Sequence, residues 1–175
     1  MILSLAVVFI PLLALTALYT NNLPDYPVAA VDPAPELARA RAEAPYPVLA
    51  PENLPTGEGG WTPTQVAWTA KGSPARDGQG ASGSDDWLWG GLDPTRTYYA
   101  LNQSDGDADD LIKKLSRDGV ADGTSTVEGD EWQRWASPDG RTRVLARVDG
   151  DVVTAVTADA SYEGLEAFAA TLQAG

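Results

Sequence analysis

The side chains most able to do chemistry in this sequence are carboxylates, because the chain contains neither histidine nor cysteine. Without those residues it supplies no imidazole base, no thiolate nucleophile and no zinc or iron–sulfur ligand of the usual kind. Ser-His-Asp and Cys-His catalytic sites are excluded for the same reason. The 25 Asp and Glu residues remain, and Asp105, Asp107 and Asp109 have the most regular spacing among them.

These three aspartates match the first half of a calcium-binding loop. Such a loop requires Gly at its sixth position and Glu at its twelfth, where this sequence has Asp110 and Ser116. Acidic residues also gather at helix N-termini, because the helix dipole favours negative charge there. We therefore expect the start of a helix here, with no bound metal and no cofactor.

Two other patterns carry weaker signals. The segment "EGDEW" places Glu128, Asp130 and Glu131 close together, which is the best candidate for a hydrolase carboxylate pair, but it coincides with an expected hairpin turn. Residues 78–83 match G-x-G-x-x-G formally, yet no strand precedes them and no helix follows, so a dinucleotide site is not predicted. We expect a protein that is not an enzyme.

Tryptophan offers a different kind of site, since the chain has six of them. An aromatic surface binds sugars or peptides, or anchors an interface. The candidates for a partner or ligand surface are Trp61, Trp87, Trp89 and Trp135. Trp87 and Trp89 share a face of one expected strand, whereas Trp132 and Trp135 point to opposite faces. Three or four of the six are expected to fill the core, which leaves one or two for such a surface.

The elements that must position these residues begin with a helix in 33–44, with Asp32 as N-cap and Pro45 beyond its end. Strands follow in "TPTQVAWTA", "WLWGGL" and "RTYYALNQS", and then a helix in "DADDLIKKLSRDG" that Gly119 ends.

Four β-like runs separated by turns come next and predict an antiparallel meander: Thr124–Glu128, Glu131–Ala136, Thr142–Asp149 and Val152–Ala158. Ser161 caps a final helix in "YEGLEAFAATLQ". The pattern predicts an α+β domain with a mostly antiparallel sheet of six or seven strands and about three helices. One sheet face is expected under helices, and the other wet or against a partner.

The opening stretch predicts a membrane anchor at residues 1–20. No charged residue occurs in 1–24, and a helix of this length approaches the hydrocarbon thickness of a bilayer. The lipid-facing side chains are Ile2, Leu3, Leu5, Val8, Phe9, Leu12, Leu13 and Leu15. A cleaved signal peptide is the alternative, but no basic residue precedes the apolar run and no clean cleavage site follows it.

Beyond the anchor, residues 21–35 form a proline-rich spacer and residues 36–175 the domain, with a flexible Gly/Ser loop at 71–86. The net charge of −13 lies entirely in this part, which excludes nucleic acid as a partner. The short N-terminal side of the anchor favours a single-pass protein of the plasma membrane with its domain on the extracytoplasmic side.

The N-terminal span, "VDPAPELARARAEAPYPVLAPENLP", "GWTPTQVAW", "GDEWQRW" and "TADASYEGLEAFAATL" together resemble domain-of-unknown-function family 4245. The resemblance implies a single-pass envelope protein of high-GC Gram-positive bacteria and assigns no activity or site residues. We expect an interaction domain, an accessory subunit of a larger membrane assembly such as a respiratory or other envelope complex. Its partners would be lipid and integral membrane subunits. The alternatives are a cell-wall saccharide or peptide binding domain and a carboxylate-dependent hydrolase.

Overall fold

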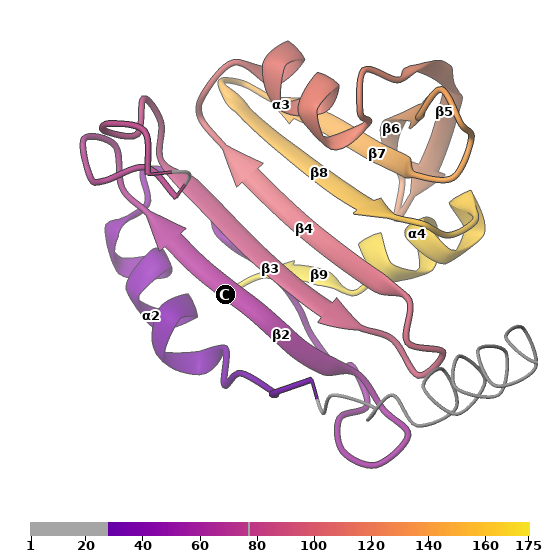
Figure 1. Cartoon of the computed structure of the whole chain (residues 1–175), viewed down its shortest axis with the longest axis horizontal. Helices are drawn as coiled ribbons and strands as arrows, with labels where there is room; N and C mark the ends of the chain where they lie inside the picture. The colour runs from indigo at the N-terminus through magenta and orange to yellow at the C-terminus, as the bar shows by residue number, and fades with distance from the viewer. Residues whose placement is uncertain (1–27, 77) are drawn as a thin grey trace, which may run out of the picture.

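A computed structural model describes residues 28–76 and 78–175, and within them a large antiparallel sheet organises the chain. Seven strands occur in the order β2-β3-β4-β8-β7-β6-β5 (Figure 1). They are β2 (Thr62–Thr69), β3 (Asp86–Leu92), β4 (Tyr98–Ser104), β5 (Val120–Val127), β6 (Asp130–Ala136), β7 (Arg143–Asp149) and β8 (Val152–Ala158). Strands β5 to β8 are consecutive antiparallel neighbours, so the predicted meander is confirmed.

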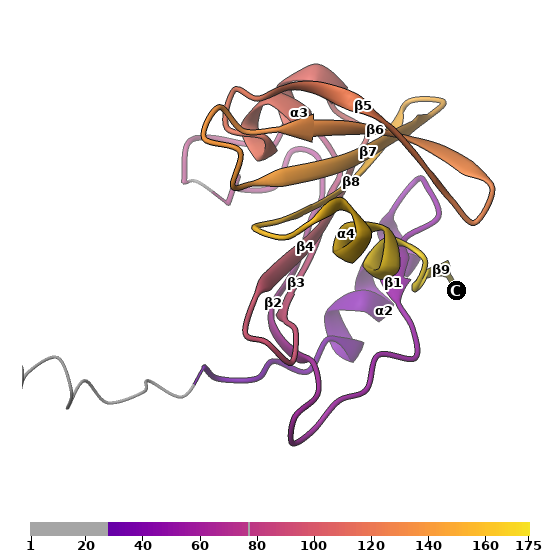
Figure 2. The ribbon, with the colours of Figure 1, turned by 90° about the vertical axis from the view of Figure 1, so that its right-hand side faces the viewer.

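Three helices pack on the sheet, and they lie on both of its faces rather than on one. Helices α2 (Ala34–Glu43) and α4 (Tyr162–Ala169) share one side with a small two-stranded sheet of β1 (Leu49–Pro51) and β9 (Leu172–Ala174), as Figure 2 shows. Helix α3 (Ala108–Leu115) lies on the other side, over β7 and β8. The α+β class with three helices is confirmed for the described residues.

The larger of two hydrophobic clusters lies between the sheet and α2, α4 and β1. At its centre Phe168 of α4 stacks on Trp61 with ring centroids 5.2 Å apart and also contacts Trp89 and Tyr99. The smaller cluster lies under α3, where Ile112 packs against Val144, Val153 and Ala155. The sheet therefore has a thickly covered face and a thinly covered one.

Several predicted boundaries shift in the structure. Asp32 does not cap α2 from the N-cap position, which Pro33 occupies; its carboxylate accepts from the N–H of Ala34 at 3.0 Å. The helix thus begins inside the predicted spacer. Strand β5 starts at Val120 rather than Thr124. Strands β1 and β9 were not predicted, because three-residue strands are too short to show a period.

The end of α3 was assigned to the wrong residue. The helix stops at Leu115, and Arg117 and Asp118 take the left-handed conformation that the glycine rule reserves for Gly119. The N–H of Asp118 donates to the carbonyl of Lys113 at 2.9 Å. Gly119 is required for a different reason, since a Cβ there would overlap the backbone of Ala136.

The predicted anchor at residues 1–20 falls outside the described residues. Among the helices that the structure does describe, none combines the length and the apolar character that a membrane crossing requires.

Candidate functional site

The thinly covered face of the sheet carries a groove beside α3. We define the open face as the side of β2, β3 and β4 that bears Leu88, Ala100 and Asn102. These residues share a face with the smaller cluster, because Asn102 pairs with Ala155 across β4 and β8. No helix of the described chain lies over this part of the sheet (Figure 1).

Two pockets on the open face make up what we call the open-face groove. The first, of about 500 Å³, lies between β3, β4, α3 and the 71–85 loop, and the second, of about 590 Å³, lies between α3 and the β3–β4 turn. Lys114 lines both. Leu111, Lys114 and Leu115 have the i, i+3, i+4 spacing of one helix face, so α3 supplies one wall throughout.

Each pocket contains one buried polar atom that has no hydrogen-bond partner among the described residues. In the first pocket it is the amide nitrogen of Asn102, and in the second it is the hydroxyl of Thr157. A buried polar group without a partner costs about 1–3 kcal/mol. Such groups are therefore rare in native folds. Two further such atoms, the indole nitrogen of Trp135 and the hydroxyl of Tyr162, lie outside the groove.

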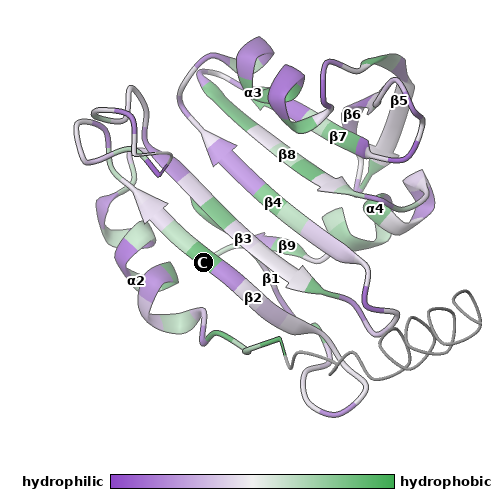
Figure 3. Ribbon diagram, in the orientation of Figure 1, coloured by the Kyte–Doolittle hydropathy of each residue, from purple (hydrophilic) through white to green (hydrophobic). Residues whose placement is uncertain are grey.

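The neighbouring residue on β4 shows that the fold can satisfy such a group. Gln103 points to the covered face and is 3% exposed. Its side-chain oxygen accepts from the N–H of Leu49 at 2.7 Å, and its amide nitrogen donates to Pro47 at 3.3 Å and Thr154 at 3.2 Å. Figure 3 shows the end of β4 as a hydrophilic segment beside the hydrophobic β8. Of the adjacent side-chain amides of Asn102 and Gln103, only that of Gln103, on the covered face, has hydrogen-bond partners for its nitrogen among the described residues.

The charge of the groove is opposite in sign to that of the chain. Four cations line it, against two carboxylates, in a molecule of net charge −13: Arg76, Arg96, Lys114 and Arg117, with Asp86 and Asp159. The ion pairs within the described residues use Arg39, Lys113, Arg134 and Arg147. None of the four groove cations therefore forms a direct ion pair with a carboxylate of the described residues, although Asp86 interacts with Arg76, and Asp139 with Arg117, through their charges.

Both groove carboxylates already have hydroxyl partners. Asp86 accepts from Ser104 at 2.6 Å, Ser84 at 3.0 Å and Ser82 at 3.1 Å. Asp159 accepts from Thr142 at 2.6 Å. These contacts hold the carboxylates within the protein, so they are not available as a catalytic pair, and each pocket contains only one of them.

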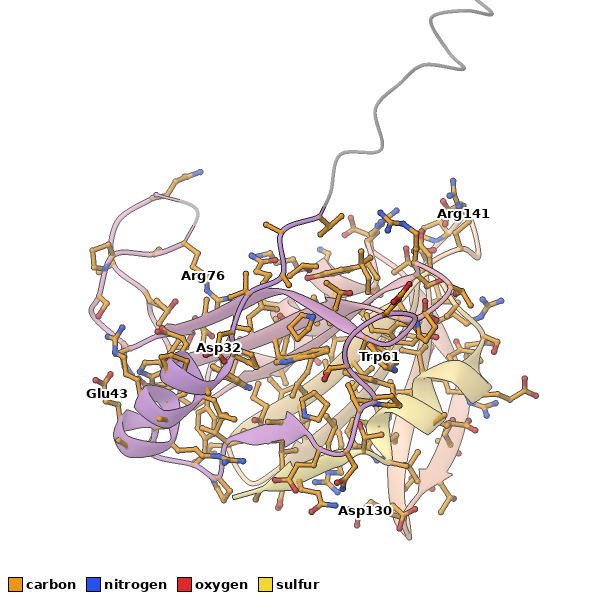
Figure 4. The ribbon with its side chains drawn as sticks, turned by 90° about the horizontal axis from the view of Figure 1, so that it is seen from below. Asp32, Glu43, Trp61, Arg76, Asp130 and Arg141 are labelled. Carbon is orange, nitrogen blue, oxygen red and sulfur yellow. The ribbon has the colours of Figure 1, made fainter. Side chains whose placement is uncertain are left out.

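Within the described part of the chain, the hydrogen-bond partners of Arg76 over the first pocket are neutral oxygens. Its Nε donates to the Thr69 hydroxyl at 3.0 Å and its Nη2 to the Asp86 backbone carbonyl at 3.3 Å. Figure 4 places it on the opposite side of the sheet from Glu43 of α2. Burial lowers the pKa of Arg76, and the nearby negative charge of Asp86 opposes this shift.

The loop that carries Arg76 is the predicted flexible Gly/Ser segment, and it contains regular backbone hydrogen bonds. The N–H of Gly72 donates to Ser82 at 2.9 Å, that of Ser82 to Ser73 at 2.7 Å and that of Ala75 to Gly80 at 2.9 Å. The G-x-G-x-x-G match lies in this turn and begins no helix. The loop therefore forms one wall of the groove.

The tryptophans predicted for a surface lie elsewhere. Trp87 and Trp89 are 1% and 3% exposed, so the expectation that they face a ligand is wrong. Trp61 is partly buried and stacked on Phe168. Trp135 lines a separate pocket of about 350 Å³ behind α3 and is also partly buried. Core filling is confirmed for four of the six: Trp68, Trp87, Trp89 and Trp132.

The aspartates considered for calcium have structural roles. Asp107 caps α3 by accepting from the N–H of Asp110 at 2.9 Å, and Asp105 accepts from the N–H of Asp85 at 2.8 Å. Within residues 28–76 and 78–175 no cluster of three or more metal-ligating side chains occurs. Of "EGDEW", Asp130 pairs with Arg147 at the β5–β6 hairpin, away from the groove.

Sequence reasoning missed the residues that form the groove. One signal was present: Asn102 and Gln103 are adjacent in a central strand, so one amide must enter each face of the sheet. The positions of Arg76 and Lys114 depend on the loop and helix packing, which no local pattern encodes.

Comparison with known proteins agrees with the resemblance. Residues 1–172 match the family model described as "Protein of unknown function (DUF4245)". No curated protein and no solved structure matches the chain. Since the family model spans nearly the whole sequence, the chain belongs to the DUF4245 family of proteins of unknown function.

Proposed function

We propose that this protein is a membrane-anchored extracytoplasmic docking module, an accessory subunit of a larger membrane protein assembly. Its site would be the open-face groove, and its ligand an extended segment of a partner protein. The apolar, uncharged N-terminal stretch supports the anchor. The domain supplies binding and carries out no chemistry.

The observation that carries this proposal is the pair of unpartnered polar atoms that lie buried just beneath the groove floor. Asn102 and Thr157 lie in different pockets and on adjacent strands, and Lys114 lines both pockets. A ligand that fills both pockets extends along α3, as a peptide segment does. Peptide carbonyls recur along such a chain and accept hydrogen bonds of the kind these atoms lack.

The test is to block the groove without disturbing the fold. Ala81 is exposed and lines the first pocket, whereas Ala167 is exposed on α4, on the covered face. Intact chains carrying Ala81→Trp or Ala167→Trp would be purified from native membranes in mild detergent. We expect the first substitution to abolish co-purification of the assembly and the second to preserve it, with equal thermal stability. Equal co-purification by both variants would contradict the proposal.

A second candidate is supported by one residue. The ring of Tyr98 is 40% exposed and lines the second pocket, which suits a sugar ring of a cell-wall saccharide. Retention of the intact protein on cell-wall polymer, lost on Tyr98→Ala, would favour this function. Trp87→Ala would not test it, because Trp87 is buried.

A further inference from the structure

We propose that the open-face groove selects an acidic segment, with a carboxylate of the ligand held between Arg76 and Lys114 above Asn102. This inference rests on the proposed docking function and adds the chemistry of the ligand. Its basis is the juxtaposition, in one pocket, of two cations that form no ion pair with a carboxylate of residues 28–76 and 78–175 and one amide donor that has no partner within the same residues.

The donors of the pocket match what a carboxylate accepts. A carboxylate has two oxygens and about four acceptor positions, and it accepts from guanidinium, ammonium and amide groups alike. Arg76 already gives one hydrogen bond each from Nε and Nη2 to neutral oxygens, which fixes the guanidinium in place. Because the cation is positioned before binding, little side-chain entropy is lost when a ligand arrives.

The internal carboxylate of the pocket does not compete for this role. Asp86 is occupied by the hydroxyls of Ser82, Ser84 and Ser104, and its backbone carbonyl, not its side chain, meets Arg76. A ligand carboxylate therefore adds a direct ion pair to Arg76, which Asp86 supplies only with a nearby charge. Hydrogen bonds between two charged groups are about twice as strong as those between neutral ones.

The rest of the groove continues the same preference. Arg96, Lys114 and Arg117 line the second pocket, where only Asp159 is negative. The rest of the acidic chain repels an acidic ligand, so binding is confined to the groove by the surrounding field. The apolar lining, which includes Leu88 at 9% and Ala158 at 4% exposed, favours a segment with apolar residues between its acids.

The experiment uses the intact chain in detergent and a fluorescent ten-residue peptide of alternating Glu and Ala as probe. A Gln and Ala peptide of the same length is its neutral counterpart. Lys114→Glu and Lys113→Glu form a matched pair of variants: the residues are adjacent on α3 and change the net charge equally, but only Lys114 lines the groove. Lys113 forms an exposed pair with Asp118, whose loss has little effect on stability.

We expect the Glu peptide to bind about tenfold more tightly than the Gln peptide at low salt, and the preference to shrink as salt is added. Lys114→Glu and Arg76→Gln should each weaken the Glu peptide about tenfold, and Lys113→Glu less than twofold. Equal affinity for the two peptides, or equal loss from both lysine variants, would overturn the inference. So would Lys114-dependent binding to phosphatidylglycerol vesicles without a preference for the Glu peptide, which would assign the groove to lipid phosphate.

Co-purification from membranes separates this inference from the function on which it rests. If Ala81→Trp loses the assembly but Lys114→Glu retains it, the groove docks a partner and the acidic chemistry is wrong. If Ala81→Trp retains the assembly, the docking function itself fails. If the assembly is lost with Ala81→Trp and with Lys114→Glu but retained with Lys113→Glu, the result supports both the docking function and the acidic ligand.

Discussion

Arg76 donates its Nη2 hydrogen bond to the backbone carbonyl of Asp86, at 3.3 Å, and not to the carboxylate of the same residue. The carboxylate is turned toward three serine hydroxyls instead. A cation and an anion that lie on adjacent elements without forming an ion pair leave the cation open to a ligand. This arrangement is the structural basis of the proposed groove.

The serine contacts of Asp86 predict the effect of removing its charge. In Asp86→Asn an amide NH2 group replaces one side-chain oxygen. This group is a donor and cannot accept a hydrogen bond from a serine hydroxyl. We expect the free energy of unfolding to fall by about 1–2 kcal/mol. Hydrogen exchange at the amide of Ser82, which donates to Ser73, should also accelerate. The exposed Asp151→Asn is the control, and identical exchange in both variants would show that Asp86 does not hold the loop.

A partly buried contact fixes α4 to the sheet and predicts a pH dependence. Arg134 of β6 donates to Glu166 at 2.7 Å, and Ser125 donates to the same carboxylate at 2.6 Å. These two contacts, that of Ser125 first, lower the pKa of Glu166 from its ordinary value of 4.5. The lowered pKa stabilises the fold above pH 4.5, and this contribution is lost as the pH falls below that value through the folded-state pKa.

Glu166→Gln should therefore lower the free energy of unfolding by about 1–2 kcal/mol at pH 7, and by less at acid pH. Urea unfolding between about pH 3 and 7, which extends below the ordinary pKa of a Glu carboxylate, measures the difference. Glu163→Gln is the matched control on the exposed side of α4. A destabilisation independent of pH would mean that the charge of Glu166 has no part in holding α4.

The aromatic centre of the covered face predicts the largest stability change. Phe168 is 2% exposed and contacts Trp61, Trp89 and Tyr99. Phe168→Ala should cost about 3–5 kcal/mol, because the neighbouring rings cannot collapse into the space. Phe168→Leu should cost roughly half as much, since more of the side chain is kept. Chemical denaturation measures both, and a loss below about 1 kcal/mol for the alanine variant would refute the packing described.

On the open face, the contact between the Tyr98 ring and Gly90 can be tested by mutation. The Tyr98 ring lies over Gly90, where a Cβ would overlap the ring, and its hydroxyl donates to Gln65 at 3.3 Å. Gly90→Ala should displace the ring and break this hydrogen bond, at a cost of about 1 kcal/mol. In a protein that already carries Tyr98→Ala, Gly90→Ala should leave the stability unchanged or raise it, because Ala suits a strand better than Gly. Additive effects in the double-mutant cycle would contradict the contact.

The sequence predicts the meander and the helices well because their signals are local. Val152–Ala158 alternates between the two clusters, and Ser161 caps α4 through the N–H of Gly164, as its position before the apolar period indicates. Both follow from neighbours in the chain. The class of the domain is predictable for the same reason.

The groove could not be predicted, because it depends on contacts between distant segments. Trp87 was a surface candidate by residue type, but its indole donates to the carbonyl of Leu49, in a strand too short to predict. Lys113 and Lys114 look equivalent in sequence, and only the packing of Ile112 against the sheet decides which faces the groove. Such facts arise from the tertiary fold.

Site-specific photo-crosslinking in intact membranes tests the docking claim most directly. A photoreactive benzoyl-phenylalanine would replace Ala81 in the groove wall or, as control, Ala167 on α4. We predict one discrete crosslinked species from position 81, joined to an integral membrane protein through an acidic extended segment, and none from position 167. The same species from both positions, or none from position 81 in membranes where the assembly is intact, would contradict the account.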